Sequence, residues 1–81
     1  MFKNKFSERN NICGVNLIEL RKANGAAFSQ RKLADAMQLE GVDLDKNAIQ
    51  RIESGQRFVT DIELAAFAKI FNVSTDYLLK K

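Results

Sequence analysis

Apolar residues recur at intervals of three and four positions along most of the chain, the spacing of helices that bury one face. The first such segment ends near Asn24 and Gly25, and its start is placed between residues 7 and 11. Gly25 suits the left-handed position that follows many helices. The face predicted to be buried carries Cys13, Leu17 and Leu20. No segment alternates apolar and polar residues for long enough to predict a strand.

A second and a third helix follow, each with its own start signal. Ser29 can cap a helix from Gln30 to about Leu39, and a glycine two positions later ends it. Asp45 can cap a helix from Lys46 to Ser54, which Gly55 terminates. The faces predicted to be buried hold Leu33, Ala34 and Met37 in the second helix, and Ile49 and Ile52 in the third.

The last third of the chain predicts one long helix and one short one. Thr60 and Glu63 form a capping-box pattern in front of a helix over residues 61–71. A short helix then begins at Ser74. The apolar residues are Leu64, Phe67, Ala68 and Phe71 in the fourth helix, and Tyr77 and Leu78 in the fifth.

The predicted fold is therefore an all-α, compact five-helix domain over residues 11–81. The connecting segments are short and polar, and neither a Gly/Ser-rich linker nor an internal repeat divides the chain. Residues 1–10 are read either as an N-terminal arm or as the frayed start of the first helix.

Composition excludes several kinds of chemistry. The 81 residues include no His and one Cys, so neither a zinc site with three soft or imidazole ligands nor a Ser–His or Cys–His catalytic pair can form. Asp43 and Asp45 lie in a turn without a supporting base, and we therefore expect no enzyme activity, no metal and no cofactor. Cys13 is interpreted as a small buried hydrophobe in a reducing cytoplasm. No stretch approaches the ~18 apolar residues of a membrane span, so the protein is expected to be soluble.

The distribution of charge is more informative than its sum. The net charge is +3, from 13 basic and 10 acidic side chains. Ten of the basic and seven of the acidic side chains lie in residues 1–57, and the last 24 residues are neutral. A surface that attracts a polyanion therefore belongs to the first two thirds of the chain.

Four ordered blocks of sequence resemble one known family. They are Phe-Ser-Gln-Arg-Lys-Leu-Ala at 28–34, Ala-Ile-Gln-Arg-Ile-Glu-Ser-Gly at 48–55, the closing apolar helix with Val-Ser-Thr-Asp-Tyr-Leu at 64–78, and Leu17, Leu20 and Arg21 after Gly14. Together they resemble the Cro and lambda-repressor type of helix-turn-helix DNA-binding domain, the XRE family, over about residues 12–79. The resemblance implies a lambda repressor-like fold in which the second and third helices form the helix-turn-helix.

The polar face of the third helix has the composition of a groove reader. Ile49 and Ile52 anchor the helix on the core, which turns the polar residues outward. Lys and Arg donate to guanine, and Asn and Gln pair with adenine, in a major groove that admits one helix. The candidate base-reading residues are Lys46, Asn47, Gln50 and Arg51. By resemblance, Lys46, Asn47 and Arg51 are the usual readers, while an ordinary solvated helix face is the alternative.

Two further sets of residues are candidates for contacts with the DNA backbone. Gln30 and the amides at the start of the second helix can face a phosphate, with Ser29 as the cap. By resemblance, Ser54, Gly55 and Arg57 after the third helix form a second phosphate clamp. Arg31 and Lys32 are plausible additions or simply solvated.

Arg21 and Glu53 are set apart from the DNA contacts. The resemblance implies that they form a partly buried ion pair between the first and third helices, a structural role. The alternative is that Arg21 binds a phosphate.

The turn between the second and third helices departs from the family pattern. The link is about five residues longer than usual, and its extra residues fall around Leu39 to Leu44. Either the second helix extends or the turn enlarges. Val42 and Leu44 alternate with Asp43 and Asp45, which predicts that the apolar residues cover the core while the acids face water. We expect the insertion to point away from DNA.

The favoured function is sequence-specific binding of double-stranded DNA in transcriptional control, most simply as a repressor. By resemblance, two copies dimerise on a palindromic operator with recognition helices about 34 Å apart. The candidate interface is the C-terminal helix with Tyr77, Leu78 and Leu79, unless these residues pack on their own core. The alternative function is a protein-interaction module with the same fold, such as an antitoxin or an antirepressor.

Overall fold

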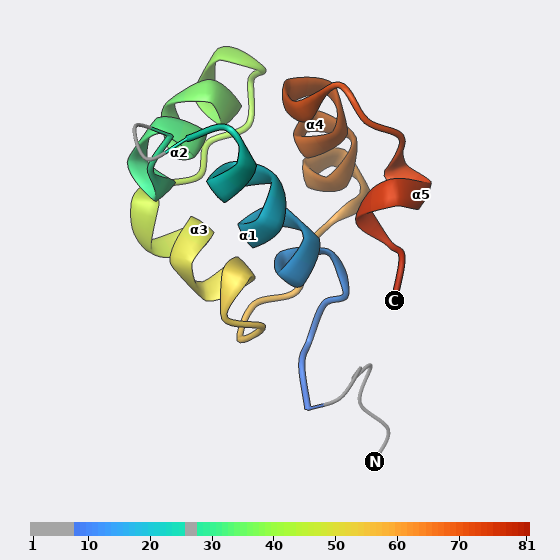
Figure 1. The fold of residues 1–81 in the computed structure, drawn as a ribbon. Coiled ribbons are helices and arrows are strands. Elements are labelled where there is room, and N and C mark those ends of the chain that lie inside the picture. The colour runs from blue at the N-terminus through green and yellow to red at the C-terminus, as the bar shows by residue number, and fades with distance from the viewer. Residues whose placement is uncertain (1–7, 26–27) are drawn as a thin grey trace.

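Every regular element of the computed structural model, which describes residues 8–25 and 28–81, is a helix (Figure 1). In chain order the helices are α1 (Cys13–Ala23), α2 (Gln30–Leu39), α3 (Lys46–Glu53), α4 (Asp61–Phe71) and α5 (Thr75–Leu78). The all-helical, five-helix fold is therefore confirmed. Residues 1–7, which make up most of the predicted arm, lie outside the described residues.

The helices after α1 begin where the sequence places their caps. Side-chain oxygens of Ser29, Asp45, Thr60 and Ser74 each accept a hydrogen bond from the backbone amide three residues later. The carboxylate of Glu63 also accepts from the Thr60 amide at 3.0 Å, which completes the predicted capping box. These bonds satisfy amides that the first helical turn leaves without partners.

Helix α1 begins at Cys13, later than the predicted interval of residues 7–11. The Asn11 side-chain oxygen accepts a hydrogen bond from the Gly14 amide at 2.8 Å, as a capping residue does. The Asn11 amide group meanwhile donates to carbonyls in and after α3. The residues before Cys13 thus make long-range contacts with α3 and do not continue α1.

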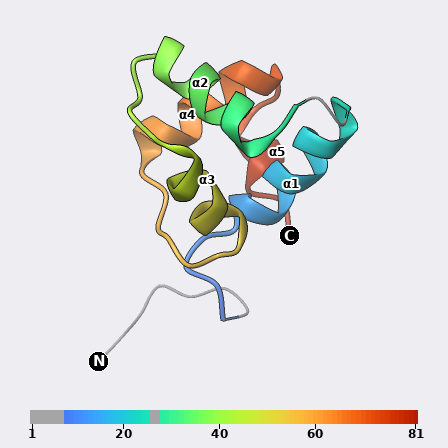
Figure 2. The same ribbon diagram turned by 90° about the vertical axis from the view of Figure 1, so that its left-hand side faces the viewer.

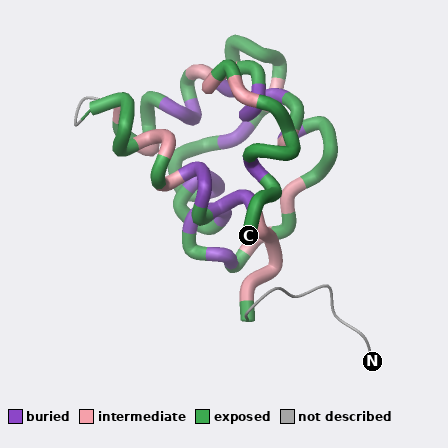
Figure 3. The backbone as a smooth tube through the Cα atoms, turned by 45° about the vertical axis from the view of Figure 1, so that its right-hand side comes forward, coloured by how far each residue is buried: buried purple, intermediate pink, exposed green. Residues whose placement is uncertain are grey.

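The core lies where the apolar faces of the helices meet (Figure 3). Its largest fully buried side chains are Leu17, Leu33, Met37, Ile49, Ile52, Phe67 and Leu78. Of the predicted core positions, Leu20, Leu64 and Phe71 are only partly buried at its edge. Leu78 is fully buried in the core of its own chain, while Tyr77 and Leu79 are 37% and 42% exposed. Leu78 is therefore removed from the predicted dimer surface.

A buried amide joins the two ends of the fold. The side chain of Asn16 in α1 is 5% exposed and donates to the carbonyls of Leu78 and Lys80, at 2.8 Å and 2.9 Å. These carbonyls lie at and beyond the end of α5, where helices leave acceptors without partners. Asn16 thus ties the end of the chain to α1, a role that the sequence pattern did not predict.

The long link between α2 and α3 forms an enlarged turn, and α2 does not extend. Helix α2 ends at Leu39, and Gly41 has a φ of +83°, a backbone conformation that side chains disfavour. Leu44 is buried and Val42 packs against the core, while Asp43 and Asp45 are exposed, as predicted. Leu39, at the start of this region, is 89% exposed.

Helices α2 and α3 pack on one another and form one side of the molecule, with α4 and α5 behind them (Figure 2). Helix α1 packs against both α3 and α5. The inner face of α3 is thus held by its neighbours, and its outer face is left to solvent. None of the helices in the described ranges has the length and apolar character to cross a membrane.

Candidate nucleic-acid interface

The outer face of α3 carries the four predicted base-reading side chains. Lys46, Asn47, Gln50 and Arg51 are all exposed. Their side chains make no hydrogen bond or ion pair with any other residue in the described ranges. On the opposite face, Ile49 and Ile52 are fully buried. The structure therefore brings the four polar groups together on a helix whose other face is fixed, and leaves them free to bind.

A crevice of about 350 Å³ separates the N-terminal part of α3 from α2. Arg31, Lys46 and Asn47 line it together with Asp35. Asp45 also lines it, but its carboxylate is engaged as the cap of α3. The two predicted reading residues at the start of α3 therefore share one surface with the first turns of α2.

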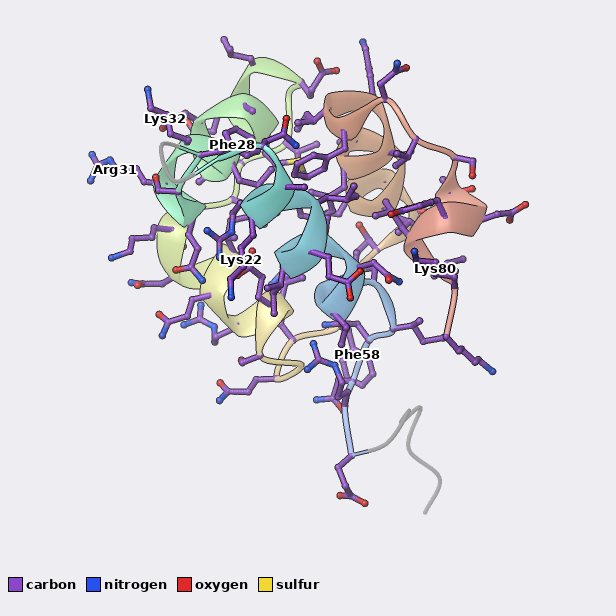
Figure 4. All side chains as sticks on the ribbon, in the orientation of Figure 1. Lys22, Phe28, Arg31, Lys32, Phe58 and Lys80 are labelled. Atoms are coloured by element: carbon purple, nitrogen blue, oxygen red, sulfur yellow. The ribbon has the colours of Figure 1, made fainter. Side chains whose placement is uncertain are left out.

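A second hollow, of about 580 Å³, lies at the N-terminus of α2 and has a basic lining. It is lined by Arg21, Ser29, Gln30, Arg31 and Lys46. Figure 4 shows the Arg31 side chain pointing away from the body of the domain. The backbone amides of Gln30 and Arg31 donate to no acceptor within the described part of the chain. Free amides, the helix dipole and the cationic side chains of Arg31 and Lys46 suit this hollow to an anion such as a phosphate.

Glu53 is the centre of a network that joins three helices. Its carboxylate is 4% exposed and accepts from Arg21 Nε at 2.8 Å and from Arg21 Nη2 at 3.0 Å. The side-chain amide of Gln30 donates to the same carboxylate at 2.9 Å. The hydrogen bond to Glu53 raises the pKa of Arg21 above its ordinary value. Arg21, Gln30 and Glu53 thus link α1, α2 and α3, and the Arg21–Glu53 pair has the geometry of the structural pair that the resemblance implied.

The loop after α3 differs from a phosphate clamp with free donors. The backbone amides of residues 54–57 all donate to carbonyls of α3, at Gln50, Arg51 and Ile52. The Arg57 guanidinium makes a two-pronged ion pair with Glu63, at 2.9 Å and 3.0 Å. In this structure the donors assigned to Ser54, Gly55 and Arg57 are therefore occupied inside the protein. A phosphate contact from this loop requires these bonds to rearrange, and it stays a prediction.

The Arg57–Glu63 pair makes stability depend on pH. The Arg57 guanidinium, helped by the Thr60 amide, holds the pKa of Glu63 below its usual value of 4.5 although burial opposes this. The folded state therefore binds the Glu63 proton less readily than the unfolded state. This contribution to stability is complete above pH 4.5 and is lost as the pH falls through the lowered pKa.

We expect the free energy of unfolding to fall between pH 5 and pH 3 by less in Glu63→Gln than in the wild-type protein. Asp43→Asn, which alters an exposed acid of the enlarged turn, is the control and should follow the wild type. Urea unfolding at each pH measures the difference. Equal acid sensitivity of Glu63→Gln and the wild type would contradict this role of the pair.

Three further residues that contact α3 are not predicted by the sequence pattern. Arg9, Asn10 and Asn11 precede α1 and donate hydrogen bonds to carbonyls at the end of α3 and in the loop that follows. The sequence pattern predicts Arg9 and Asn10 to be part of an N-terminal arm or of the frayed start of the first helix. A glycine at the second position of α1 was the one local hint that another segment approaches closely there.

The arrangement of α2 and α3, with one face in the core and one exposed, is that of a helix-turn-helix. A helix-turn-helix family model matches residues 17–78, which is more than half of the chain, and the protein belongs to this family. This family is the Cro and lambda-repressor type that the sequence resembles. Membership of the family indicates DNA binding in transcription regulation. Neither the curated proteins nor the solved structures include a match to the chain.

Neither a metal-ligand cluster nor an exposed thiol is found among the described residues. No cluster of three or more His, Cys, Asp or Glu side chains is placed there to hold a metal ion. The Cys13 thiol is 2% exposed, and burial raises its pKa to about 11. Because the thiolate is the reactive form, Cys13 is a structural residue.

Proposed function

We infer that the protein binds double-stranded DNA sequence-specifically, with α3 in the major groove, and acts as a transcriptional repressor in the cytoplasm. The observation that carries this proposal is that α3 has one exposed polar face and one face fixed in the core. Four side chains of groove-reading type are exposed on its outer face and have no partner within the described ranges, while its inner face and its Glu53 carboxylate are fixed to the rest of the domain. Such preorganisation limits the entropy lost on binding.

The chemistry of each side chain suggests its target. Lys46 and Arg51 can donate to O6 and N7 of guanine, and Asn47 and Gln50 can pair with N6 and N7 of adenine. The hollow at the N-terminus of α2 is the proposed primary phosphate site, with donors from Ser29, Gln30 and Arg31. Contacts to phosphate fix the register of the helix, and contacts to bases supply the specificity.

The enlarged turn is proposed to stay clear of the DNA. Glu40 pairs with Lys69 of α4 at 3.0 Å, and the turn starts at the C-terminal end of α2, opposite to the end that borders the hollow. Acids placed away from the DNA backbone avoid repulsion by phosphate.

Two copies are proposed to bind a palindromic operator as a homodimer. The exposed rings and methyl groups of Tyr77 and Leu79 are the proposed contact, with Leu78 excluded because it is buried. The Lys80 ammonium lies 4.0 Å from the centre of the Tyr77 ring. Gel filtration over a range of concentrations should show self-association that Tyr77→Ser weakens, and an unchanging monomer speaks against a dimer formed without DNA.

The proposal predicts binding to random duplex DNA that weakens steeply with salt. Each phosphate that a basic group neutralises contributes about 0.9 to the slope of log affinity against log salt concentration. Arg31→Ala should lower that slope by about one, because Arg31 lines the phosphate hollow. Fluorescence anisotropy across a salt series measures the slope, and Lys69→Ala, on α4, is the control.

The outcome of this series also separates the two candidate functions. An affinity that does not change with salt, or the lack of any duplex enriched from a random pool, would falsify the DNA-binding proposal. That result would favour the alternative function, a protein-interaction module of the antitoxin or antirepressor kind.

A further inference from the structure

We propose that Arg9, Asn10 and Asn11, here called the N-terminal clamp, position the recognition helix α3 for base reading, with Arg9 as the main positioning residue. This inference rests on the proposed function, because it assigns a role in reading DNA to residues that do not touch it. It arises from the hydrogen bonds of three residues that lie ahead of α1.

The clamp supplies donors to the end of α3 and to the loop that follows. Arg9 Nη2 donates to the Glu53 carbonyl at 2.6 Å and to the Ile52 carbonyl at 3.4 Å. Asn11 Nδ2 also donates to the Ile52 carbonyl, at 3.0 Å, and to that of Arg57 at 2.7 Å. The last carbonyls of a helix lack partners within it, so these bonds cap the C-terminal end of α3 from outside.

Asn10 extends the same contact by one step. Its backbone amide donates to the Gly55 carbonyl at 2.8 Å, and its side chain donates to the Gln56 carbonyl at 2.9 Å. The clamp therefore follows the backbone from the last turn of α3 into the loop. Sequence separations above 40 residues make these contacts tertiary ones.

Two glycines give the clamp its space. A Cβ at Gly14 would lie closer than 3.0 Å to the Ile52 carbonyl oxygen, to Arg9 Nη2 and to Asn11 Oδ1. A Cβ at Gly55 would meet the Arg9 side chain at 2.9 Å, and the φ of Gly55 is +86°. Both positions exclude side chains at the point where the clamp and α3 touch.

Charge favours the same arrangement. The C-terminal end of a helix carries a partial negative charge, and the Arg9 guanidinium rests against it. Arg9 Nε is buried and has no hydrogen-bond partner among the residues that the structure describes. A buried donor without an acceptor is unfavourable, and the short bond to Glu53 and the helix dipole offset that cost.

The geometry explains why this end of α3 matters for reading. Its eight residues span about 12 Å, so a tilt of about 10° moves one end by about 2 Å relative to the other. Base contacts tolerate displacements of only about 0.5 Å. Leu44 and the Asp45 cap hold the N-terminal end, and the clamp holds the end that carries Arg51. Glu53 is thus held through its carboxylate by Arg21 and through its carbonyl by Arg9.

The test compares Arg9→Met, which keeps the aliphatic stem but removes the donors and the charge, with Arg9→Lys, which keeps the charge. Lys69→Met is the matched control, because it removes one positive charge from the exposed surface of α4. Affinity is measured for a duplex that the wild-type protein selects from a random pool and for random duplex, each over a salt series.

We expect Arg9→Met to reduce the preference for the selected duplex over random duplex about tenfold. This is about the discrimination that is lost when one bidentate base contact is displaced. Arg9→Lys should restore part of that preference, and Lys69→Met should retain all of it. The salt slopes of Arg9→Met and Lys69→Met should agree, since the proposal gives Arg9 no contact with a phosphate. Where Arg9→Met is too unstable, Asn10→Ala should show a smaller change in the same direction.

Two results would overturn the proposal. They are an unchanged preference in Arg9→Met, whether or not its stability falls, and a salt slope that falls by about one more than in the control. Amide hydrogen exchange at residues 54–57 distinguishes a failure of the clamp proposal from a failure of the proposed function. If the wild-type protein selects no duplex, the function fails, and equal exchange in Arg9→Met and Lys69→Met then shows that the clamp itself does not hold α3.

Discussion

We expect Arg21→Met to lower the free energy of unfolding by about 3 kcal/mol, because it leaves the buried Glu53 carboxylate without its cationic partner. For a domain of this size that loss corresponds to a melting temperature lower by roughly 15 °C. Only the Gln30 amide would remain on the carboxylate from the network described above. Calorimetry or urea unfolding of the purified variant measures the effect.

The double variant Arg21→Met/Glu53→Met separates the ion pair from simple loss of packing. It removes both charges, and we expect it to recover a large part of the lost stability, because no buried charge is left unpaired. Arg21→Met with a loss below about 1 kcal/mol would instead mean that the pair behaves like an exposed one. The network would then not be what fixes α3 on α1 and α2.

We expect Lys46→Ala/Arg51→Ala to lower the preference for the selected duplex over random duplex by a factor of about one hundred or more. Each bidentate base contact contributes about 1 to 3 kcal/mol of discrimination, and contacts at separate base pairs add approximately. The phosphate hollow at α2 keeps Ser29, Gln30 and Arg31, so binding to random DNA should persist. Competition between the two duplexes measures the preference.

The matched control for this pair is Lys22→Ala/Lys69→Ala, which removes the same charge from the exposed surfaces of α1 and α4. Neither lysine belongs to the face of α3 or to the proposed dimer contact. The control should retain the preference for the selected duplex. Equal losses in the two double variants would mean that net charge, and not the face of α3, is responsible.

Features set by a few neighbouring residues were predictable from the sequence. Helices α2 and α4 have the predicted bounds, and α3 ends one residue before the predicted Ser54. The reason is that a cap such as Asp45 and a terminator such as Gly55 act within one turn of the helix they delimit. The exposed face of α3 follows from the same local information, since burying Ile49 and Ile52 turns Lys46 and Arg51 outward.

Features that depend on residues far apart in the chain were not predictable in this way. The bond from Arg9 to the Glu53 carbonyl and the bonds from Asn16 to Leu78 and Lys80 join polar residues that no periodic pattern relates. The same limit explains the late start of α1, because Asn11 takes part in such contacts. For Arg57, the resemblance gave a role at the DNA backbone, whereas the structure pairs this side chain with Glu63.

Methylation protection by dimethyl sulfate on the selected duplex tests most directly whether α3 reads the major groove. Guanine N7 lies in the major groove and adenine N3 in the minor groove. The account predicts that the wild-type protein protects guanine N7 within the site, that Lys46→Ala/Arg51→Ala loses this protection, and that adenine N3 stays as reactive as in free DNA. Protection confined to adenine N3, or guanine protection that survives in the double variant, would contradict it.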